Sequence, residues 1–89
     1  MSQNKKSTIS IVVPVMNEEE NVPILHQKIT EAMANWDREY EIIIVDDGSS
    51  DRTFEILEAL AKKDKHLIVI KFRRNFGQSA AMGAGFDAA

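Results

Sequence analysis

The chain has 89 residues, a formal net charge of −3 at pH 7 and no cysteine, so it forms one small domain at most. Without cysteine there is neither a disulfide framework nor a thiolate zinc site, and the acidic balance argues against a protein that binds nucleic acid or an anionic membrane. No apolar run approaches the roughly 18 residues that cross a bilayer, and the polar first eight residues argue against a secretory signal.

Three short apolar runs predict β-strands in chain order. After a segment 1–7 that we expect to be disordered, the runs cover residues 9–13, 42–45 and 67–70. Each is rich in β-branched residues and nearly continuous, which is typical of strands in a parallel sheet that is covered on both faces.

Helical patterns lie between and after these strands. Apolar residues recur at steps of three and four, and short oxygen side chains precede the second pattern as candidate caps. The first stripe consists of Val22, Leu25, Ile29 and Met33, the second of Phe54, Leu57 and Ala61 after Ser50 or Asp51, and a third, beginning near Gly77, of Ala80, Ala81, Ala84 and Ala88. The order β-α-β-α-β-α predicts an α/β fold in three layers, α/β/α, with right-handed crossovers. The last pattern has no stop signal, so we expect the domain to continue beyond Ala89.

Polar and turn-forming residues follow each predicted strand. Pro14–Glu18 come after the first strand, Asp46–Gly48 after the second, and Arg73 and Arg74 after the third. Ligands of open parallel sheets bind outside the carboxyl ends of the strands. Neighbouring strands lie about 5 Å apart, so the first two segments would line one crevice. Pro14, Val15, Met16, Asn17, Glu18, Asp46, Asp47 and Gly48 are therefore candidate ligand-binding residues.

Each of these residue types has a chemical use at such an edge. The Asp47 carboxylate can accept hydrogen bonds from a base N–H or from ribose hydroxyls. Successive strand residues point to opposite faces, so we expect one of Asp46 and Asp47 to bind and the other to brace the loop. Gly48 permits a positive φ. Arg73 and Arg74 offer planar sets of donors to a diphosphate or to an acceptor phosphate.

Simpler interpretations remain open from the residues alone. Asp46–Asp51 could be a strand-to-helix turn with its cap, Glu18–Glu20 could only complement a helix N-terminus, and the two arginines could be solvated surface. We interpret His26 and His66 as incidental. The cluster Lys62–Lys65 is interpreted as an exposed turn.

Three segments resemble a known family. Val13–Asn21 is similar to the opening strand and loop of family 2 glycosyltransferases, which have the GT-A fold, and Tyr40–Asp51 is similar to their second signature. Arg74–Gln78, followed by an alanine-rich helix, resembles the polyprenyl-phosphate glycosyltransferases, a subgroup that includes dolichyl-phosphate mannose synthases and bacterial undecaprenyl-phosphate glucosyl and aminoarabinosyl transferases. The similarity runs from about Thr8 to Ala89. Residues 8–89 are thus interpreted as the nucleotide-binding N-terminal part of an incomplete GT-A domain.

The resemblance implies roles for particular residues. Pro14, Met16, Glu18, Val45 and Asp47 would contact the donor nucleotide, with Asp47 at the base. Met16 stands where the family often has Tyr, and it lacks the ring and hydroxyl. The resemblance also implies Mg²⁺ or Mn²⁺, held by an Asp-any-Asp motif. That motif would follow Ala89, so neither catalytic nor metal-binding residues are expected within this chain.

For the full-length protein, the resemblance implies transfer of a hexose with inversion to a polyprenyl phosphate. The preferred pair is UDP-glucose and undecaprenyl phosphate, at the cytoplasmic face of a membrane reached through C-terminal segments. The present segment is expected to be soluble, cytosolic and inactive alone, without a nucleic-acid partner, and homo-oligomerisation is left open. The alternatives are a GDP-mannose:dolichyl-phosphate mannosyltransferase and a non-catalytic nucleotide-binding or interaction module. A dinucleotide-binding Rossmann unit fails, because the first strand lacks a Gly-x-Gly-x-x-Gly turn.

Overall fold

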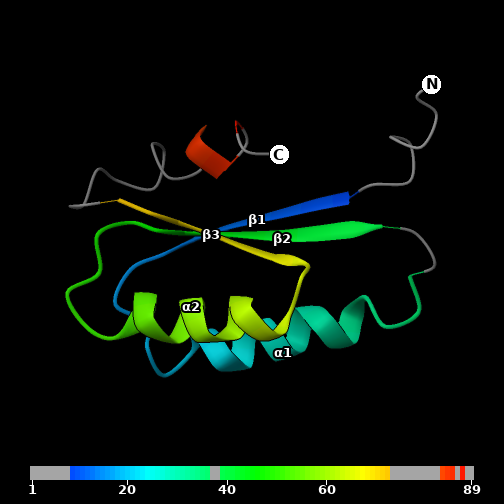
Figure 1. The fold of residues 1–89 in the computed structure, drawn as a ribbon, viewed down its shortest axis with the longest axis horizontal. Helices are drawn as coiled ribbons and strands as arrows, with labels where there is room; N and C mark the ends of the chain where they lie inside the picture. The colour runs from blue at the N-terminus through cyan, green and yellow to red at the C-terminus, as the bar shows by residue number, and fades with distance from the viewer. Residues whose placement is uncertain (1–8, 37–38, 73–82, 86, 88–89) are drawn as a thin grey trace.

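The computed structural model describes residues 9–36, 39–72, 83–85 and 87. They form a parallel sheet in the order β1-β2-β3 with two helices along one of its faces (Figure 1). The elements are β1 (Ile9–Val15), α1 (Val22–Ala32), β2 (Tyr40–Asp46), α2 (Thr53–Lys63) and β3 (Leu67–Lys71). These elements confirm the predicted order up to β3. The predicted disordered segment 1–7 lies outside the described residues.

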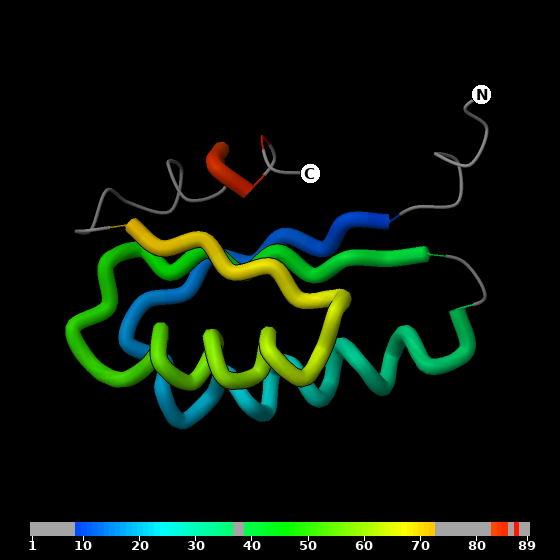
Figure 2. Tube along the Cα trace, viewed as in Figure 1, coloured from blue at the N-terminus to red at the C-terminus, as the bar shows by residue number. Residues whose placement is uncertain are grey.

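The strands end level with one another. Val15 pairs with Asp46, and Asp46 pairs with Lys71. The Cα trace in Figure 2 shows the three strands running alongside each other, with the loops to α1 and α2 leaving from the same end. This register brings the segments that follow β1 and β2 to one edge of the sheet.

The main core lies between the sheet and the two helices. Alternate residues of the strands contribute to it, together with most of both predicted helical stripes. Met33 and Phe54 of those stripes are not among its members. Its buried members are Val15, Val22, Ile42, Ile44, Leu57 and Leu67, with Leu25, Ile29, Leu60 and Ala61 packed against them. Complete burial of one such aliphatic side chain stabilises the fold by about 1.5–3 kcal/mol. Burial of these apolar residues thereby places α1 and α2 in one layer against the sheet.

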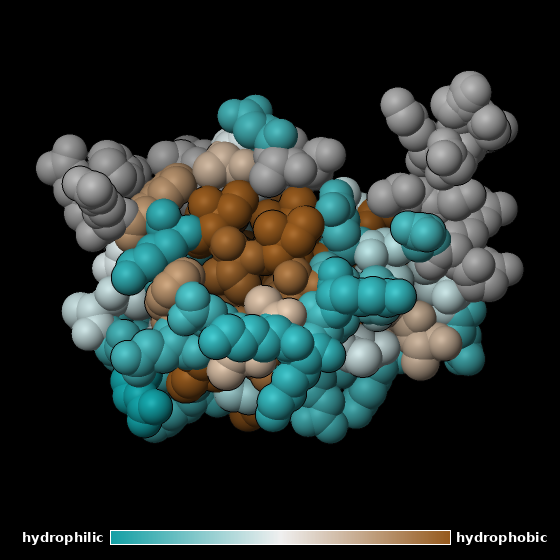
Figure 3. All heavy atoms as spheres, viewed as in Figure 1, coloured by the Kyte–Doolittle hydropathy of each residue, from teal (hydrophilic) through white to brown (hydrophobic). Residues whose placement is uncertain are grey.

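A smaller cluster lies on the opposite face of the sheet. Ile43 and Val45 are fully buried there, and the helical turn of residues 83–85 lies over this face (Figure 1). A Cβ atom at Gly85 would lie 2.3 Å from Cγ1 of Val12, so the close approach requires glycine. The turn is consistent with the predicted third layer, although residues 77–82 of the expected helix lie outside the described part of the chain. Figure 3 shows apolar atoms gathered between this turn and α2. On β3, Ile68 is 39% exposed.

Two histidines interpreted as incidental share one carboxylate. The imidazole of His26 on α1 donates from Nε2 to Oδ2 of Asp64 (2.7 Å), and His66 donates from Nδ1 to Oδ1 (2.9 Å). The His66 ring also stacks on Tyr40, with ring centroids 4.0 Å apart. The interpretation of this turn as simply exposed is wrong at Asp64, whose side chain is 16% exposed. Its partner His26 lies 38 residues away in the sequence, so this contact needed the packed fold to bring α1 against the end of α2.

The hydrogen bonds of Asp64 with His26 and His66 are expected to make the stability of the fold depend on pH in the acid range. Burial raises the pKa of the Asp64 carboxyl, but hydrogen bonds from the His66 amide and from both imidazoles outweigh it, and the pKa lies below its usual value of 3.8. Because the folded-state pKa is lowered, this stabilisation is present above that value and is lost as the pH falls through the folded-state pKa. Urea denaturation from about pH 5 down to pH 2 should show a smaller pH dependence for Asp64→Asn than for wild type. Glu58→Gln, at an exposed position on α2, is the control, and equal slopes for Asp64→Asn and wild type would contradict the assignment.

Candidate functional site

Asn17 ties the loop after β1 to the loop after β2. Its side-chain Oδ1 accepts hydrogen bonds from the amides of Ser50 (2.8 Å) and Asp51 (3.3 Å). The backbone amide of Asn17 donates to Oγ of Ser49 (2.8 Å). Asn17 has a φ of 55°, a left-handed conformation that asparagine tolerates better than most residues. The two loops are therefore one hydrogen-bonded unit.

A second set of bonds joins the same loops nearer to the core. Thr53, which is fully buried, accepts the amide of Glu18 at Oγ1 (2.8 Å) and donates its hydroxyl to Oδ1 of Asp51. Asp51 Oδ1 also accepts the Thr53 amide (2.9 Å). The N-cap position of α2 is held by Arg52 without a side-chain cap hydrogen bond, so neither Ser50 nor Asp51 is the N-cap. Glu19 Oε1 accepts the amide of Arg52 (3.0 Å). Burial raises the pKa of Asp51, but the Thr53 hydrogen bonds outweigh it, and the pKa lies below its usual value of 3.8.

The adjacent carboxylates Asp46 and Asp47 are both buried. Asp46 is fully buried, and its Oδ1 accepts the amide of Ser49 (2.9 Å), which supports the bracing role for this residue. Its Oδ2 has no hydrogen-bond partner within the described part of the chain. Asp47 is 3% exposed, and its amide donates to the carbonyl of Val15 (2.8 Å). Gly48 has a φ of 80°, as the expected turn requires.

A cavity of about 250 Å³ lies beside the end of β1 and the start of α1. It is lined by Pro14, Val15, Glu18, Asn21, Val22 and Leu25. The first three were candidate ligand-binding residues. Asn21 was not among the candidate residues, although its position three residues after Glu18, at the helix start, was a usable signal.

Other candidates lie away from this cavity. Met16 is 41% exposed, whereas the side chain of Val45 is buried on the face that Gly85 covers. Asp47 and Gly48 do not line the cavity. Arg73 and Arg74 lie outside the described residues. The structure thus brings the two loops together. Of the candidate residues, Pro14, Val15 and Glu18 line the cavity, Met16 is exposed, and Val45, Asp46 and Asp47 are buried.

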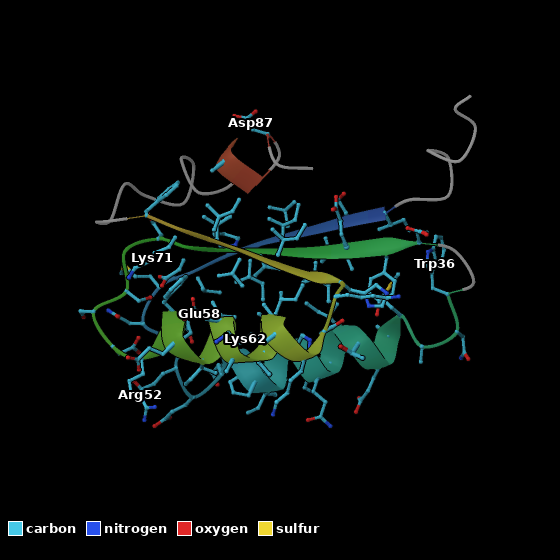
Figure 4. The ribbon with its side chains drawn as sticks, in the orientation of Figure 1. Trp36, Arg52, Glu58, Lys62, Lys71 and Asp87 are labelled. Carbon is cyan, nitrogen blue, oxygen red and sulfur yellow. The ribbon has the colours of Figure 1, made fainter. Side chains whose placement is uncertain are left out.

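Lys71, which was not among the candidate residues, adds a positive charge near these loops. Figure 4 shows it at the carboxyl end of β3, on the side of the sheet that carries α2. Its Nζ lies 4.5 Å from the ring centroid of Phe54 in the first turn of α2, a cation–π arrangement. The aromatic ring holds this ammonium group close to the loop after β2.

The described residues hold neither a cluster of metal-ligand side chains nor a membrane-spanning helix. They contain no group of three or more His, Cys, Asp or Glu side chains able to hold a metal ion. The ligands of the implied Mg²⁺ or Mn²⁺ were expected beyond Ala89, so that metal site stays a prediction. In the same residues, none of the helices has the length and apolar character to cross a bilayer.

Solved structures define the class of the fold. A mannosyltransferase from Pyrobaculum calidifontis, in complex with GDP-Man and Mn²⁺, matches with a TM-score of 0.73 and 21% identity over 91% of this chain and 24% of its own. S. aureus TarS, residues 1–349, matches with a TM-score of 0.76 and 26% identity over 92% of this chain and 24% of its own. These neighbours confirm the predicted α/β nucleotide-binding half of a GT-A domain.

The family model for glycosyl transferase family 2 matches residues 10–89, and the chain belongs to that family. A protein of Photorhabdus laumondii, named undecaprenyl-phosphate 4-deoxy-4-formamido-L-arabinose transferase, is 43% identical over 98% of this chain and 27% of its own length. A Yersinia pestis protein of the same name is 49% identical over 89% of this chain and 24% of its length. The chain thus spans about a quarter of the length of these relatives.

Proposed function

We propose that the interlocked loops 16–21 and 47–52 hold the nucleoside of a sugar donor, and that the full-length protein is a glycosyltransferase. The observation that carries this proposal is the hydrogen-bonded union of the two loops through Asn17 and Thr53, beside the cavity that Glu18 lines. A pocket of fixed shape with a few placed polar groups suits a small polar ligand. Family membership supports a nucleotide sugar as that ligand.

The proposed reaction transfers a sugar to a polyprenyl phosphate with inversion at the anomeric carbon. Because the acceptor phosphate is already an anion, attack requires no strong general base. Stabilising the charge of the leaving diphosphate is the harder problem. A divalent ion neutralises such charge when bound.

The acceptor and the sugar are inferred from the relatives. Their names support undecaprenyl phosphate, which would place the protein at a membrane, on the cytoplasmic face in our proposal. The names also favour 4-deoxy-4-formamido-L-arabinose over the glucose that the sequence analysis preferred. We keep UDP as the proposed nucleotide and GDP as its rival.

Calorimetric titration of the full-length protein with UDP and with GDP tests the proposal. UDP should bind more tightly, and Glu18→Ala should weaken UDP binding about 10- to 100-fold, the effect of losing one charge-assisted hydrogen bond. Glu20→Ala, at an exposed position in the same loop, is the matched control and should bind as wild type does. Tighter binding of GDP would refute the donor assignment. Binding without sugar transfer to undecaprenyl phosphate would favour the non-catalytic binding module.

A further inference from the structure

Glu18 is held at three separate points. Its amide donates to Thr53 Oγ1 (2.8 Å), and its carbonyl accepts the amides of Asn21 and Val22 (both 2.9 Å). The third point is the side chain, where Nδ2 of Asn21 donates to Oε1 of the Glu18 carboxylate (2.7 Å). A glutamate that is only half-buried ordinarily samples several rotamers. Here its backbone N–H and C=O are both bonded, and one carboxylate oxygen accepts an exposed hydrogen bond from Asn21.

The carboxylate and the amide that holds it both line the cavity beside β1. The other lining residues are Pro14, Val15, Val22 and Leu25, so the polar groups stand against an apolar wall. The Asn21 side chain makes no hydrogen bond that caps α1. Its contact with Glu18 therefore does not serve as a cap of the helix.

We propose that Asn21 is a positioning residue that aims the Glu18 carboxylate at the nucleoside of the donor. The inference rests on the proposed function of this site. The carboxylate oxygen not held by Asn21 is an acceptor without a proton of its own, so it recognises a group that donates, either a base N–H or a ribose hydroxyl. Asn21 removes rotamer freedom before the ligand arrives, which lowers the entropic cost of binding.

The side-chain amide of Asn21 also complements the negative charge of the Glu18 carboxylate. An aspartate there would be similar in shape but would place a second carboxylate against Glu18 and remove the N–H donor. Asn21→Asp is therefore expected to weaken nucleotide binding more than Asn21→Ala does. A role of Asn21 confined to filling space would produce the opposite order, because aspartate preserves the volume and alanine does not.

The test measures UDP affinity of the full-length protein by calorimetry, together with donor KM and kcat. Asn21→Ala should weaken UDP binding about tenfold, raise KM in proportion and leave kcat nearly unchanged, since the lost rotamer restriction is of that size. In a Glu18→Ala background the same change should have almost no effect. Asn35→Ala, at an exposed loop position, is the control. Asn21→Ser, which retains a residue favoured at helix starts, replaces Asn21→Ala if that variant folds poorly.

A second ligand distinguishes a base N–H from a ribose hydroxyl as the group that donates to the Glu18 carboxylate. With 2′,3′-dideoxyuridine diphosphate, a penalty from Asn21→Ala that persists identifies a base N–H, and one that disappears identifies a ribose hydroxyl. Wild-type affinity in Asn21→Ala, with weakened binding in Glu18→Ala, would overturn this inference and leave the proposed function standing. If Asn21→Ala lowers UDP affinity by the same factor in the Glu18→Ala background as in wild type, the inference is also overturned. Failure of the wild-type protein to bind UDP or GDP would instead refute the proposed function.

Discussion

Replacing Asn17 with alanine is expected to destabilise the protein by about 2–4 kcal/mol and to weaken nucleotide binding at least tenfold. The change removes the Asn17 Oδ1 acceptor of the Ser50 and Asp51 amides, two exposed hydrogen bonds that contribute about 0.5–1.5 kcal/mol each. Alanine at a φ of 55° adds about 1 kcal/mol of backbone strain. Because the two loops would no longer hold each other, urea denaturation and UDP titration should both show the loss.

Three further variants separate the causes at Asn17. Asn17→Gly removes the acceptor but tolerates the positive φ, so it should be less destabilising than Asn17→Ala. Asn17→Asp keeps the acceptor and should retain most of the stability. Asn35→Ala, at an exposed position, should behave as wild type. Equal effects of Asn17→Ala and Asn35→Ala would show that the loops do not depend on this side chain.

Thr53→Val is expected to destabilise the protein by about 1–3 kcal/mol, although it preserves the size and shape of the side chain. Thr53 is fully buried, and its hydroxyl serves the amide of Glu18 and the carboxylate of Asp51 at once. Valine offers neither a donor nor an acceptor, so both partners lose a bond in a place with little access to water. The loop that carries Glu18 should therefore loosen, and UDP affinity should fall with stability.

Thr53→Ser is the matched control, because serine keeps the hydroxyl and loses only a methyl group. Amide hydrogen exchange at Glu18 provides a local measurement. It should accelerate in Thr53→Val and remain slow in Thr53→Ser. If Thr53→Val retains wild-type stability and slow exchange at Glu18, the bond between Thr53 and Glu18 does not hold this loop.

The strands, the helices and the edge that carries the loops followed from local patterns in the sequence. Continuous β-branched runs predicted 42–45 and 67–70 as strands, and the structure places them within β2 and β3. Helical periodicity marked Val22 and Leu57, both fully buried, as core residues. These predictions succeed because periodicity and burial are properties of a few neighbouring residues. The alternation of strands and helices also predicted that the loops after β1 and β2 would meet.

The contacts within the site required the tertiary structure. The bonds of Asn17 to Ser49 and of Glu18 to Thr53 span 32 and 35 residues. The bond from the Ser49 amide to Asp46 Oδ1, which supports the bracing role of Asp46, also needed the three-dimensional structure. Likewise, no local pattern linked His26 to Asp64 or indicated that Gly85 lies against Val12 and Val45. Sequence periodicity determines which faces of an element are buried. The register of the strands and the packing of one element on another determine which polar atoms come within hydrogen-bonding distance.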